Sequence, residues 1–196
     1  MFTGLTESIG KIASVSRDTA GMSILILSTF NKILNQGESV LVDGVCLTVS
    51  AATADGFSAY LSQETIDRTT FKKVFPNKKV NLELPLSATS FLGGHLVSGH
   101  VDTTGTIISN RTKGETKILS IRYPTSFSKY VVEKGSIAVN GVSLTISKAG
   151  DTNFEIVLIP ETIKRTNLGT SHSGDLANLE FDMIAKYIER IISKRK

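Results

Sequence analysis

The side chains best suited to chemistry are few in this chain and lie far apart in the sequence. There are three histidines and one cysteine among 196 residues. The ordinary pKa of histidine lies near neutrality, so a histidine can transfer protons, and a thiol or hydroxyl can act as a nucleophile. These residues form no cluster with metal-ligand spacing, and the sequence has no P-loop and no dinucleotide-binding glycine motif. The pattern therefore indicates no metal site and no nucleotide cofactor.

The polar residues that could position a ligand belong to an internal repeat. Residues 42–50 read Val-Asp-Gly-Val-Cys-Leu-Thr-Val-Ser and return about 97 positions later as Val-Asn-Gly-Val-Ser-Leu-Thr-Ile-Ser. Between residues 39–83 and 136–180, about 18 of roughly 45 positions are identical without a gap, where unrelated sequences would give about three. Residues 2–12 resemble residues 97–107 in the same way. A period of this length matches a whole small domain, so we expect one domain duplicated and fused.

Each half has the pattern of short β-strands. In the first copy Val45 shares a face with the apolar residues at 47 and 49, while Cys46 and Thr48 lie on the other, polar face. Asp-Gly and Asn-Gly pairs before these strands are strong tight-turn signals. The repeated Glu-Thr-Ile-x-Arg-Thr motif fits a short helical turn, with Ser62 as a possible cap. Several short, closely punctuated strands per half favour a small closed barrel.

The C-terminal stretch differs from the rest of the chain. From 182 to 194 the apolar residues recur at helical spacing, and Asp182 is suited to cap the helix. The first half has no counterpart, because Pro85 occupies that region. The apolar stripe must pack either on its own barrel or on another copy of the chain, and we favour self-association. The expected domains are residues 1–87, 88–182 and a helix with a basic tail at 183–196.

Composition narrows the class of protein. Hydrophobic content of 40% and charged content of 20% are typical of globular proteins. We find no apolar run long enough to span a membrane and no signal-peptide pattern, and a lone cysteine fits a reducing compartment. We therefore expect a cytoplasmic protein without a membrane partner. The net charge of +4 is concentrated in the terminal Lys-Arg-Lys, which we interpret as a solvated tail, so we expect no nucleic-acid partner.

Four features together resemble the riboflavin synthase family of the alpha-chain type. They are the start Met-Phe-Thr-Gly, the segment Gly-Gly-His-Leu-Val-Ser-Gly-His-Val-Asp at 93–102, the paired Gly-Val-x-Leu-Thr strands and the paired Glu-Thr-Ile-x-Arg-Thr turns. The resemblance covers almost the whole chain. It implies an all-β fold of two tandem six-stranded Greek-key barrels, and a C-terminal helix that assembles a homotrimer with the active site between subunits.

The resemblance also implies a reaction without cofactor or metal. Two molecules of 6,7-dimethyl-8-ribityllumazine bind per active site, and a four-carbon unit passes from one to the other. The products are riboflavin and 5-amino-6-ribitylaminouracil. A duplicated domain suits this reaction, because two copies of one molecule need two similar pockets. Stacking two flat rings in reactive geometry can lower the barrier by about 7–11 kcal/mol.

The family's substrate contacts carry over by motif to both barrels. For the first barrel they are Gly4, Leu5, Thr6, Cys46, Leu47, Thr48, Tyr60, Leu61, Ser62, Gln63, Glu64 and Thr65. For the second barrel they are Gly99, His100, Val101, Lys134, Ser143, Leu144, Thr145, Val157, Leu158, Ile159, Pro160, Glu161 and Thr162. We expect many of these residues to act through main-chain groups, and the two Glu-Thr pairs to hold ribityl hydroxyls.

Catalysis requires a proton to leave the C7 methyl group of one lumazine and a nucleophile to add at C7 of the other. His100 is the candidate acid–base residue, and Ser39, Cys46 and Thr48 are candidates for the nucleophile or for orienting a water. We interpret His95 and His172 as structural or surface residues. Two alternatives remain: a lumazine- or flavin-carrying relative without catalysis, and an oligonucleotide-binding barrel, which the scarcity of aromatics on the polar strands disfavours.

Overall fold

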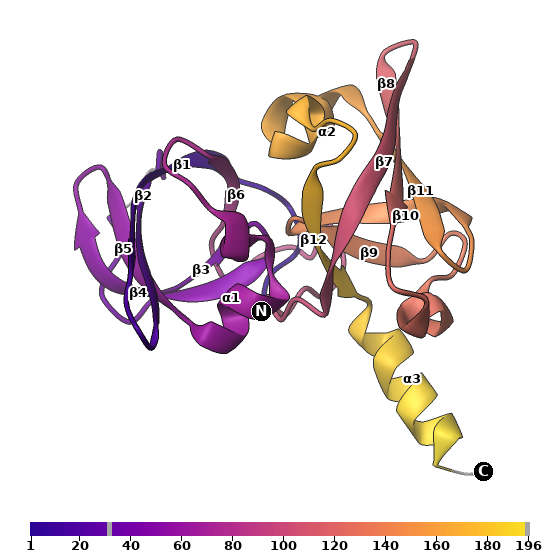
Figure 1. The fold of residues 1–196 in the computed structure, drawn as a ribbon, viewed down its shortest axis with the longest axis horizontal. Coiled ribbons are helices and arrows are strands. Elements are labelled where there is room, and N and C mark those ends of the chain that lie inside the picture. Colours follow the sequence, from indigo (N-terminus) through magenta and orange to yellow (C-terminus); the bar gives the residue numbers. More distant parts are fainter. Residues whose placement is uncertain (31–32, 195–196) are drawn as a thin grey trace.

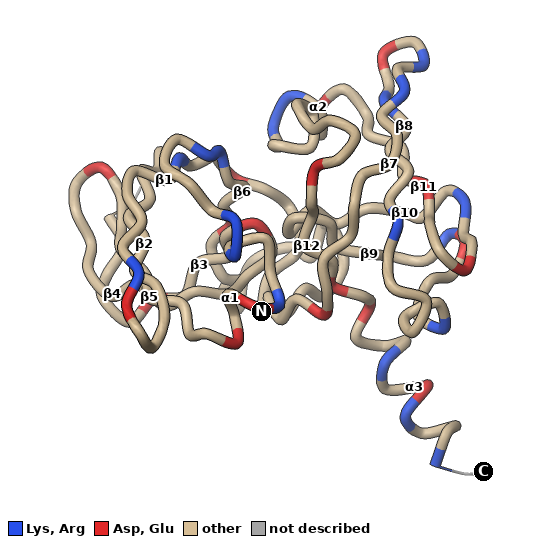
Figure 2. The backbone as a smooth tube through the Cα atoms, in the orientation of Figure 1, with Lys and Arg blue, Asp and Glu red and all other residues tan. Residues whose placement is uncertain are grey.

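The computed structural model describes residues 1–30 and 33–194 and contains two β-barrels side by side, with a helix projecting from the second (Figure 1). Within these residues each barrel is a closed antiparallel sheet of six strands. The predicted all-β architecture of two tandem barrels and a C-terminal helix is confirmed. Lys and Arg residues are interspersed with Asp and Glu residues along the backbone of both barrels (Figure 2).

The strands of the first barrel follow one another around the sheet in the order β1-β2-β5-β4-β3-β6. The predicted turn after β5 is helical, and Ser62 caps it by accepting a hydrogen bond from Thr65 N at 3.3 Å. The elements are β1 (Ser8–Arg17), β2 (Gly21–Leu27), β3 (Ser39–Val42), β4 (Val45–Thr53), β5 (Gly56–Ser62), α1 (Gln63–Arg68), the 3₁₀ helix η1 (Thr70–Lys73) and β6 (Lys79–Glu83).

The second barrel repeats this arrangement strand for strand, in the order β7-β8-β11-β10-β9-β12. A 3₁₀ helix, η2 (Thr125–Tyr130), lies between β8 and β9. The other elements are β7 (Thr103–Lys113), β8 (Thr116–Arg122), β9 (Ser136–Val139), β10 (Val142–Ala149), β11 (Asn153–Leu158), α2 (Pro160–Arg165), η3 (Asn167–Thr170) and β12 (Leu176–Phe181).

Matching irregularities curve the strands of both barrels. The register of β1 against β2 shifts between Ile12 and Ser14, and that of β7 against β8 shifts between Ile107 and Ser109. A second shift recurs where β4 pairs with β5 and where β10 pairs with β11. An extra residue in one strand bends and twists it, which is what closing a sheet of six short strands requires. The repeat therefore preserves curvature as well as side chains.

The C-terminal helix α3 (Met183–Ser193) begins at the predicted cap: Asp182 accepts a hydrogen bond from Ile184 N at 2.9 Å. Two ion pairs hold it to the second barrel, Lys186–Asp102 at 2.6 Å and Lys129–Glu189 at 2.7 Å. Five of its large apolar side chains are more than half exposed: Ile184, Tyr187, Ile188, Ile191 and Ile192. The described helices include none with the length and apolar character needed to cross a membrane. Arg195 and Lys196 of the predicted basic tail lie outside the described residues.

Asparagines preserved in the repeat join the two barrels. Asn81 Nδ2 donates a hydrogen bond to Asn140 O at 3.0 Å, and its counterpart Asn178 donates to Asp43 O at 2.8 Å. Within each barrel the same strands are tied to these turns, because Asn81 N donates to Asp43 Oδ1 and Asn178 N donates to Asn140 Oδ1, both at 2.8 Å. The residues that form each Asx-Gly turn thus also form the junction between barrels.

A buried charge breaks the symmetry of this junction. Asp43 is fully buried, whereas the equivalent residue is the neutral Asn140. Asp43 Oδ1 also accepts a hydrogen bond from Asn167 Nδ2 at 2.8 Å, but Oδ2 has no hydrogen-bond partner and lies 3.6 Å from Lys78 Nζ. Burial raises the pKa of Asp43, and the charge of Lys78 and the hydrogen bonds only partly offset this. The ionised carboxylate is therefore a net cost to the folded state.

Replacing Asp43 with Asn is expected to stabilise the protein at pH 8 by about 1 kcal/mol, or ~2–4 °C in Tm. A raised carboxyl pKa contributes stability below the unfolded pKa, and that contribution is lost as pH rises through the folded pKa. The advantage of Asp43→Asn should therefore shrink as the pH falls toward 4. Thermal unfolding across this range checks it, with the exposed Asp55→Asn as a charge-matched control. A less stable Asp43→Asn protein at pH 8 would show that the Lys78 contact outweighs burial.

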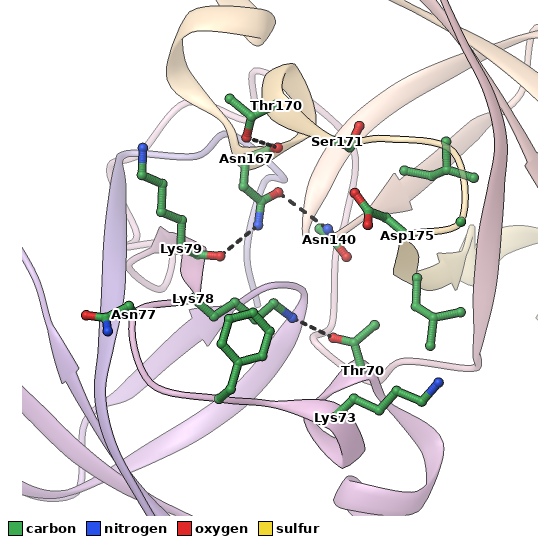
Figure 3. A pocket seen from close by; sticks show the side chains of 14 residues that line it. Thr70, Lys73, Asn77, Lys78, Lys79, Asn140, Asn167, Thr170, Ser171 and Asp175 are labelled. Atoms are coloured by element: carbon green, nitrogen blue, oxygen red, sulfur yellow. Dashed lines mark hydrogen bonds between the residues drawn. The ribbon is translucent and has the colours of Figure 1, made fainter.

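A cleft of about 640 Å³ lies between the barrels beside this junction (Figure 3). Residues 70–79 of the first half form one wall and residues 167–176 of the second half form the other. Lys78 Nζ donates to Thr70 Oγ1 at 3.3 Å on the first wall, and Asn140 Nδ2 donates to Asn167 Oδ1 at 3.4 Å across the floor (Figure 3). None of residues 70–79 is identical to its counterpart in residues 167–176, so the two walls differ in sequence although they are equivalent in the repeat.

Candidate active site

The polar strand faces predicted from the sequence are present on both barrels. On β4 the side chains of Val45, Leu47 and Val49 are buried, while Cys46 is half-buried and Thr48 is exposed. Ser39 on β3 is the direct cross-strand partner of Thr48, so these three predicted catalytic residues lie together. The second barrel repeats the set with Ser143 and Thr145 on β10. Neighbouring hydroxyl and thiol groups on one face can hydrogen-bond a polar ligand edge.

Four of the predicted contact residues face the barrel interiors. The side chains of Leu47, Leu61, Leu144 and Leu158 are buried in the two hydrophobic cores. A ligand on the outer face can reach only their main-chain N–H and C=O groups. This agrees with the expectation that many of the contacts are made by the backbone.

The segments that precede each barrel are exchanged between barrels. Cys46 N donates a hydrogen bond to Gly99 O at 2.9 Å, and Val101 packs against the core of the first barrel. Reciprocally, Ser143 N donates to Gly4 O at 2.8 Å. The sequence-based grouping of residues 4–6 with the first strand face and of residues 99–101 with the second is therefore wrong. His100, which is exposed, stands beside the first barrel's face, and Leu5 and Thr6 stand beside the second barrel's face.

The exchange depends on glycine at the crossing points. Gly4 has φ +77° and Gly99 has φ +82°, a conformation that residues with a side chain rarely adopt. A Cβ on Gly4 would lie 2.5 Å from Ser143 Cβ, and one on Gly99 would lie 2.5 Å from Cys46 Cβ. Backbone therefore lies directly against the polar strand in both sites.

The second site contains a histidine, His95, for which the sequence predicts no catalytic role. His95 Nδ1 lies 2.7 Å from Ser143 Oγ, and either atom donates, depending on the imidazole tautomer. Burial lowers the pKa of His95, although Asp182 and Glu180 act in the opposite direction. A neutral imidazole next to a hydroxyl can take or return its proton. The prediction that His95 is only structural or at the surface missed this contact, because His95 precedes the repeat and has no counterpart to align with.

The helical turns α1 and α2 lie at the end of β5 and β11. Glu64 pairs with Arg68 at 3.2 Å and Glu161 pairs with Arg165 at 3.4 Å, so each glutamate forms an ion pair within its own helical turn. The glutamates are exposed, and the following residues, Thr65 and Thr162, are half-buried. Three other predicted contacts on these turns, Gln63, Ile159 and Pro160, are exposed.

The remaining predicted contacts are more peripheral. Tyr60 is partly exposed, and its hydroxyl donates to Asp18 Oδ1 at 3.3 Å in the turn between β1 and β2. Val157 is partly exposed on β11. Lys134 is exposed with φ 66°, and its main-chain N donates to Ile146 O at 2.8 Å. The equivalent of Lys134 is Gly37, so the second half has a lysine with positive φ where the first half has a glycine.

A cleft of about 770 Å³ opens beside His100. α1 contributes Glu64 and Arg68 to its wall, and α3 contributes Met183, Lys186, Tyr187 and Arg190. The C-terminal helix therefore borders the site that holds His100. Among the described residues, no group of three or more His, Cys, Asp or Glu side chains is placed to bind a metal ion.

Comparison with known proteins identifies both halves. The lumazine binding domain matches residues 3–85 and again residues 98–182. The riboflavin synthase of Mycobacterium tuberculosis is 40% identical over 98% of this chain and 98% of its own length. The riboflavin synthase of Actinobacillus pleuropneumoniae is 38% identical over 100% of this chain and 91% of its own length. Bacillus subtilis riboflavin synthase is also 38% identical, over 99% of this chain and 91% of its own length.

Solved structures show the same fold. LumP complexed with riboflavin superposes with a TM-score of 0.86 at 26% identity, covering 92% of this chain and 99% of LumP. LumP complexed with 6,7-dimethyl-8-(1'-D-ribityl) lumazine gives a TM-score of 0.83 at the same identity, covering 92% of this chain and 98% of LumP. Both halves match the lumazine binding domain, and the chain is similar over its full length to the riboflavin synthases named above. The chain therefore belongs to the riboflavin synthase family.

Proposed function

We propose that this chain forms riboflavin from two molecules of 6,7-dimethyl-8-ribityllumazine, by transfer of a four-carbon unit, with 5-amino-6-ribitylaminouracil as the second product. The observation that carries the proposal is the pair of equivalent polar faces, each completed by a segment from the other repeat. A reaction between two identical molecules needs two such receptors. Two substrate molecules contain the same atoms as the two products, so the transfer consumes no external oxidant or reductant.

The differences between the two sites support separate roles for donor and acceptor. The first strand face contains Cys46 and lies beside His100. The second strand face contains Ser143 and lies beside His95. We propose that His100 transfers the proton of the C7 methyl group, and that a hydroxyl or thiol of the strand face adds at C7 or orients a water there. Main-chain groups of β4, β5, β10 and β11 bind the pteridine edge, and Thr65 and Thr162 bind ribityl hydroxyls with their neighbouring glutamates.

The active unit is proposed to be a homotrimer in which a first-barrel pocket of one subunit faces a second-barrel pocket of another. The support is the exposed apolar side of α3, together with the contribution of α3 to the cleft beside His100. Assembly through this helix would enclose the reacting rings and exclude water.

A carrier without catalysis fits the molecule less well. Both copies keep Gly-Val-x-Leu-Thr and Glu-Thr-Ile-x-Arg-Thr, and α3 is present. The chain is also more similar in sequence to the riboflavin synthases than to LumP. Incubation of the purified protein with 6,7-dimethyl-8-ribityllumazine alone tests the proposal. We expect riboflavin absorbance and the diaminopyrimidine to appear in equal amounts. Binding without any riboflavin would establish the carrier.

Replacing His100 with Ala is expected to lower kcat by about 100-fold while changing the lumazine Kd less than about threefold, because a general acid–base group acts in the transition state. Steady-state kinetics and fluorescence titration measure the two effects. His172→Ala, which removes an exposed histidine, is the matched control and should leave both values unchanged. Equal losses of turnover and binding in His100→Ala would mean that His100 only shapes the pocket.

A further inference from the structure

Two buried glutamates hold the exchanged segments in place. Glu83 ends β6 and Glu180 lies near the end of β12, at equivalent positions of the repeat, and both are almost completely buried. Glu83 accepts hydrogen bonds from Thr3 N at 2.6 Å, Thr3 Oγ1 at 2.7 Å and Gly4 N at 3.0 Å. The proposed catalytic scheme uses neither carboxylate.

The second glutamate repeats this set of hydrogen bonds, and each glutamate with its three donors is called a clamp below. Glu180 accepts hydrogen bonds from Ser98 N at 2.7 Å, Ser98 Oγ at 2.6 Å and Gly99 N at 2.9 Å. Ser98 Oγ in turn accepts a hydrogen bond from His100 N at 3.3 Å. A chain of hydrogen bonds therefore connects Glu180 to the backbone of the candidate acid–base residue.

Each clamp acts on the strand face of the opposite barrel. Glu180 belongs to the second barrel, yet the Gly99 that it holds is bonded to Cys46 of the first barrel. Glu83 belongs to the first barrel, yet the Gly4 that it holds is bonded to Ser143 of the second. The connection therefore runs crosswise between the two sites.

A carboxylate is chemically suited to this task. Both of its oxygens accept, so it satisfies two successive backbone N–H groups and a hydroxyl, and charge-assisted bonds of this kind are stronger than neutral ones. For Glu83, burial raises the pKa, and the hydrogen bonds from Thr3 and Gly4 act in the opposite direction. A glutamine would present an N–H group to a backbone N–H and leave both without an acceptor.

We propose that Glu83 and Glu180 are positioning residues that act crosswise: Glu180 orders residues 98–101, including His100, over the first-barrel site, and Glu83 orders residues 3–6 over the second. The identity of the ligand in these sites rests on the proposed function, whereas the crosswise positioning is independent of that function. Loss of Glu180 should therefore disturb the surroundings of Cys46, and loss of Glu83 should not.

The protein's single cysteine provides the test, because Cys46 lies under Gly99 in the first site. The rate at which dithionitrobenzoate modifies the thiol is measured in full-length Glu180→Gln and Glu83→Gln without ligand. We expect Glu180→Gln to raise this rate by about fivefold or more, since a loosened turn uncovers the thiol, and Glu83→Gln to match the parent protein. Equal acceleration in both variants, or acceleration in Glu83→Gln alone, would overturn the proposal.

A milder variant covers the case in which Glu180→Gln does not fold. Ser98→Ala removes one hydrogen bond to the clamp and the acceptor of His100 N, so a smaller acceleration of about threefold is expected. An unchanged rate in folded Ser98→Ala and Glu180→Gln would contradict the positioning role. Kinetics then link it to turnover: Glu180→Gln should lower kcat about tenfold with a smaller change in KM.

The proposed function is tested separately, in the parent protein. Bound 6,7-dimethyl-8-ribityllumazine should slow modification of Cys46. Absence of this protection would count against lumazine binding at the first site, but would leave the ligand-free comparison of the two glutamate variants intact.

Discussion

The double substitution Ile188→Lys and Ile191→Lys is expected to dissociate the protein into monomers and to lower turnover by more than about 100-fold. Both isoleucines are more than half exposed, in line with the other apolar residues of α3. Each isoleucine buried in an interface contributes about 1.5–3 kcal/mol, and a buried lysine without a partner adds a penalty. Because the proposed site lies between subunits, monomers would lack a facing pocket. Light scattering after size exclusion, together with riboflavin formation, measures both effects.

The control for this experiment is the same substitution at another exposed isoleucine. Ile33 lies in the first barrel and is 71% exposed, so Ile33→Lys should leave assembly and turnover unchanged. The double variant should keep its barrels folded, since α3 contributes no strand to either sheet. A parent protein that is monomeric and fully active would refute the proposed trimer.

Alanine at Gly99 is expected to reduce turnover at least about 100-fold while most of the fold persists. The added Cβ would meet Cys46 Cβ at 2.5 Å and Cys46 N at 2.8 Å, and the residue would have to keep φ +82°. Positive φ alone costs about 1–3 kcal/mol for a residue with a side chain. The clash with backbone adds to this, so the turn that carries His100 should be displaced. Turnover and thermal unfolding report the effect.

Gly37→Ala separates the two contributions to that effect. Gly37 has φ +90°, but a Cβ there would meet nothing within 4 Å. It should therefore show the backbone strain without the clash, and lose a little stability but little activity. Gly4→Ala should reproduce the loss of Gly99→Ala through the second site. Similar activity in Gly99→Ala and Gly37→Ala would mean that close packing on Cys46 is not required.

The fold was predictable because duplication doubles the evidence for each element. The alternation at Cys46 and Thr48 alone indicates a strand, and its recurrence in the second copy makes coincidence implausible. The helix followed from apolar spacing and from Asp182 as a cap. The polar strand faces were found for the same reason: which face a residue occupies depends on local periodicity.

The exchange of segments was not predictable from the same pattern. Aligning Gly4 with Gly99 shows that the two positions are equivalent, but not which barrel each one contacts. The two halves have the same fold, so their aligned sequences look the same whether each segment contacts its own barrel or the other barrel. Asn81 recurs as Asn178 in the repeat, but the alignment does not reveal that both side chains bond across the junction between the barrels. Such contacts join residues far apart in the chain, and no local period reports them.

The crossing of residues 1–6 and 97–101 also constrains the origin of the molecule. A single repeat on its own would have an open strand face and a loose arm with nowhere to dock. A separate copy of one repeat would need a second copy to supply the segment that completes its strand face, so the domain is suited to pair reciprocally with itself. Fusion of the two copies makes this pairing intramolecular, and it allows the two segments to differ, with His100 in one and Leu5 in the other.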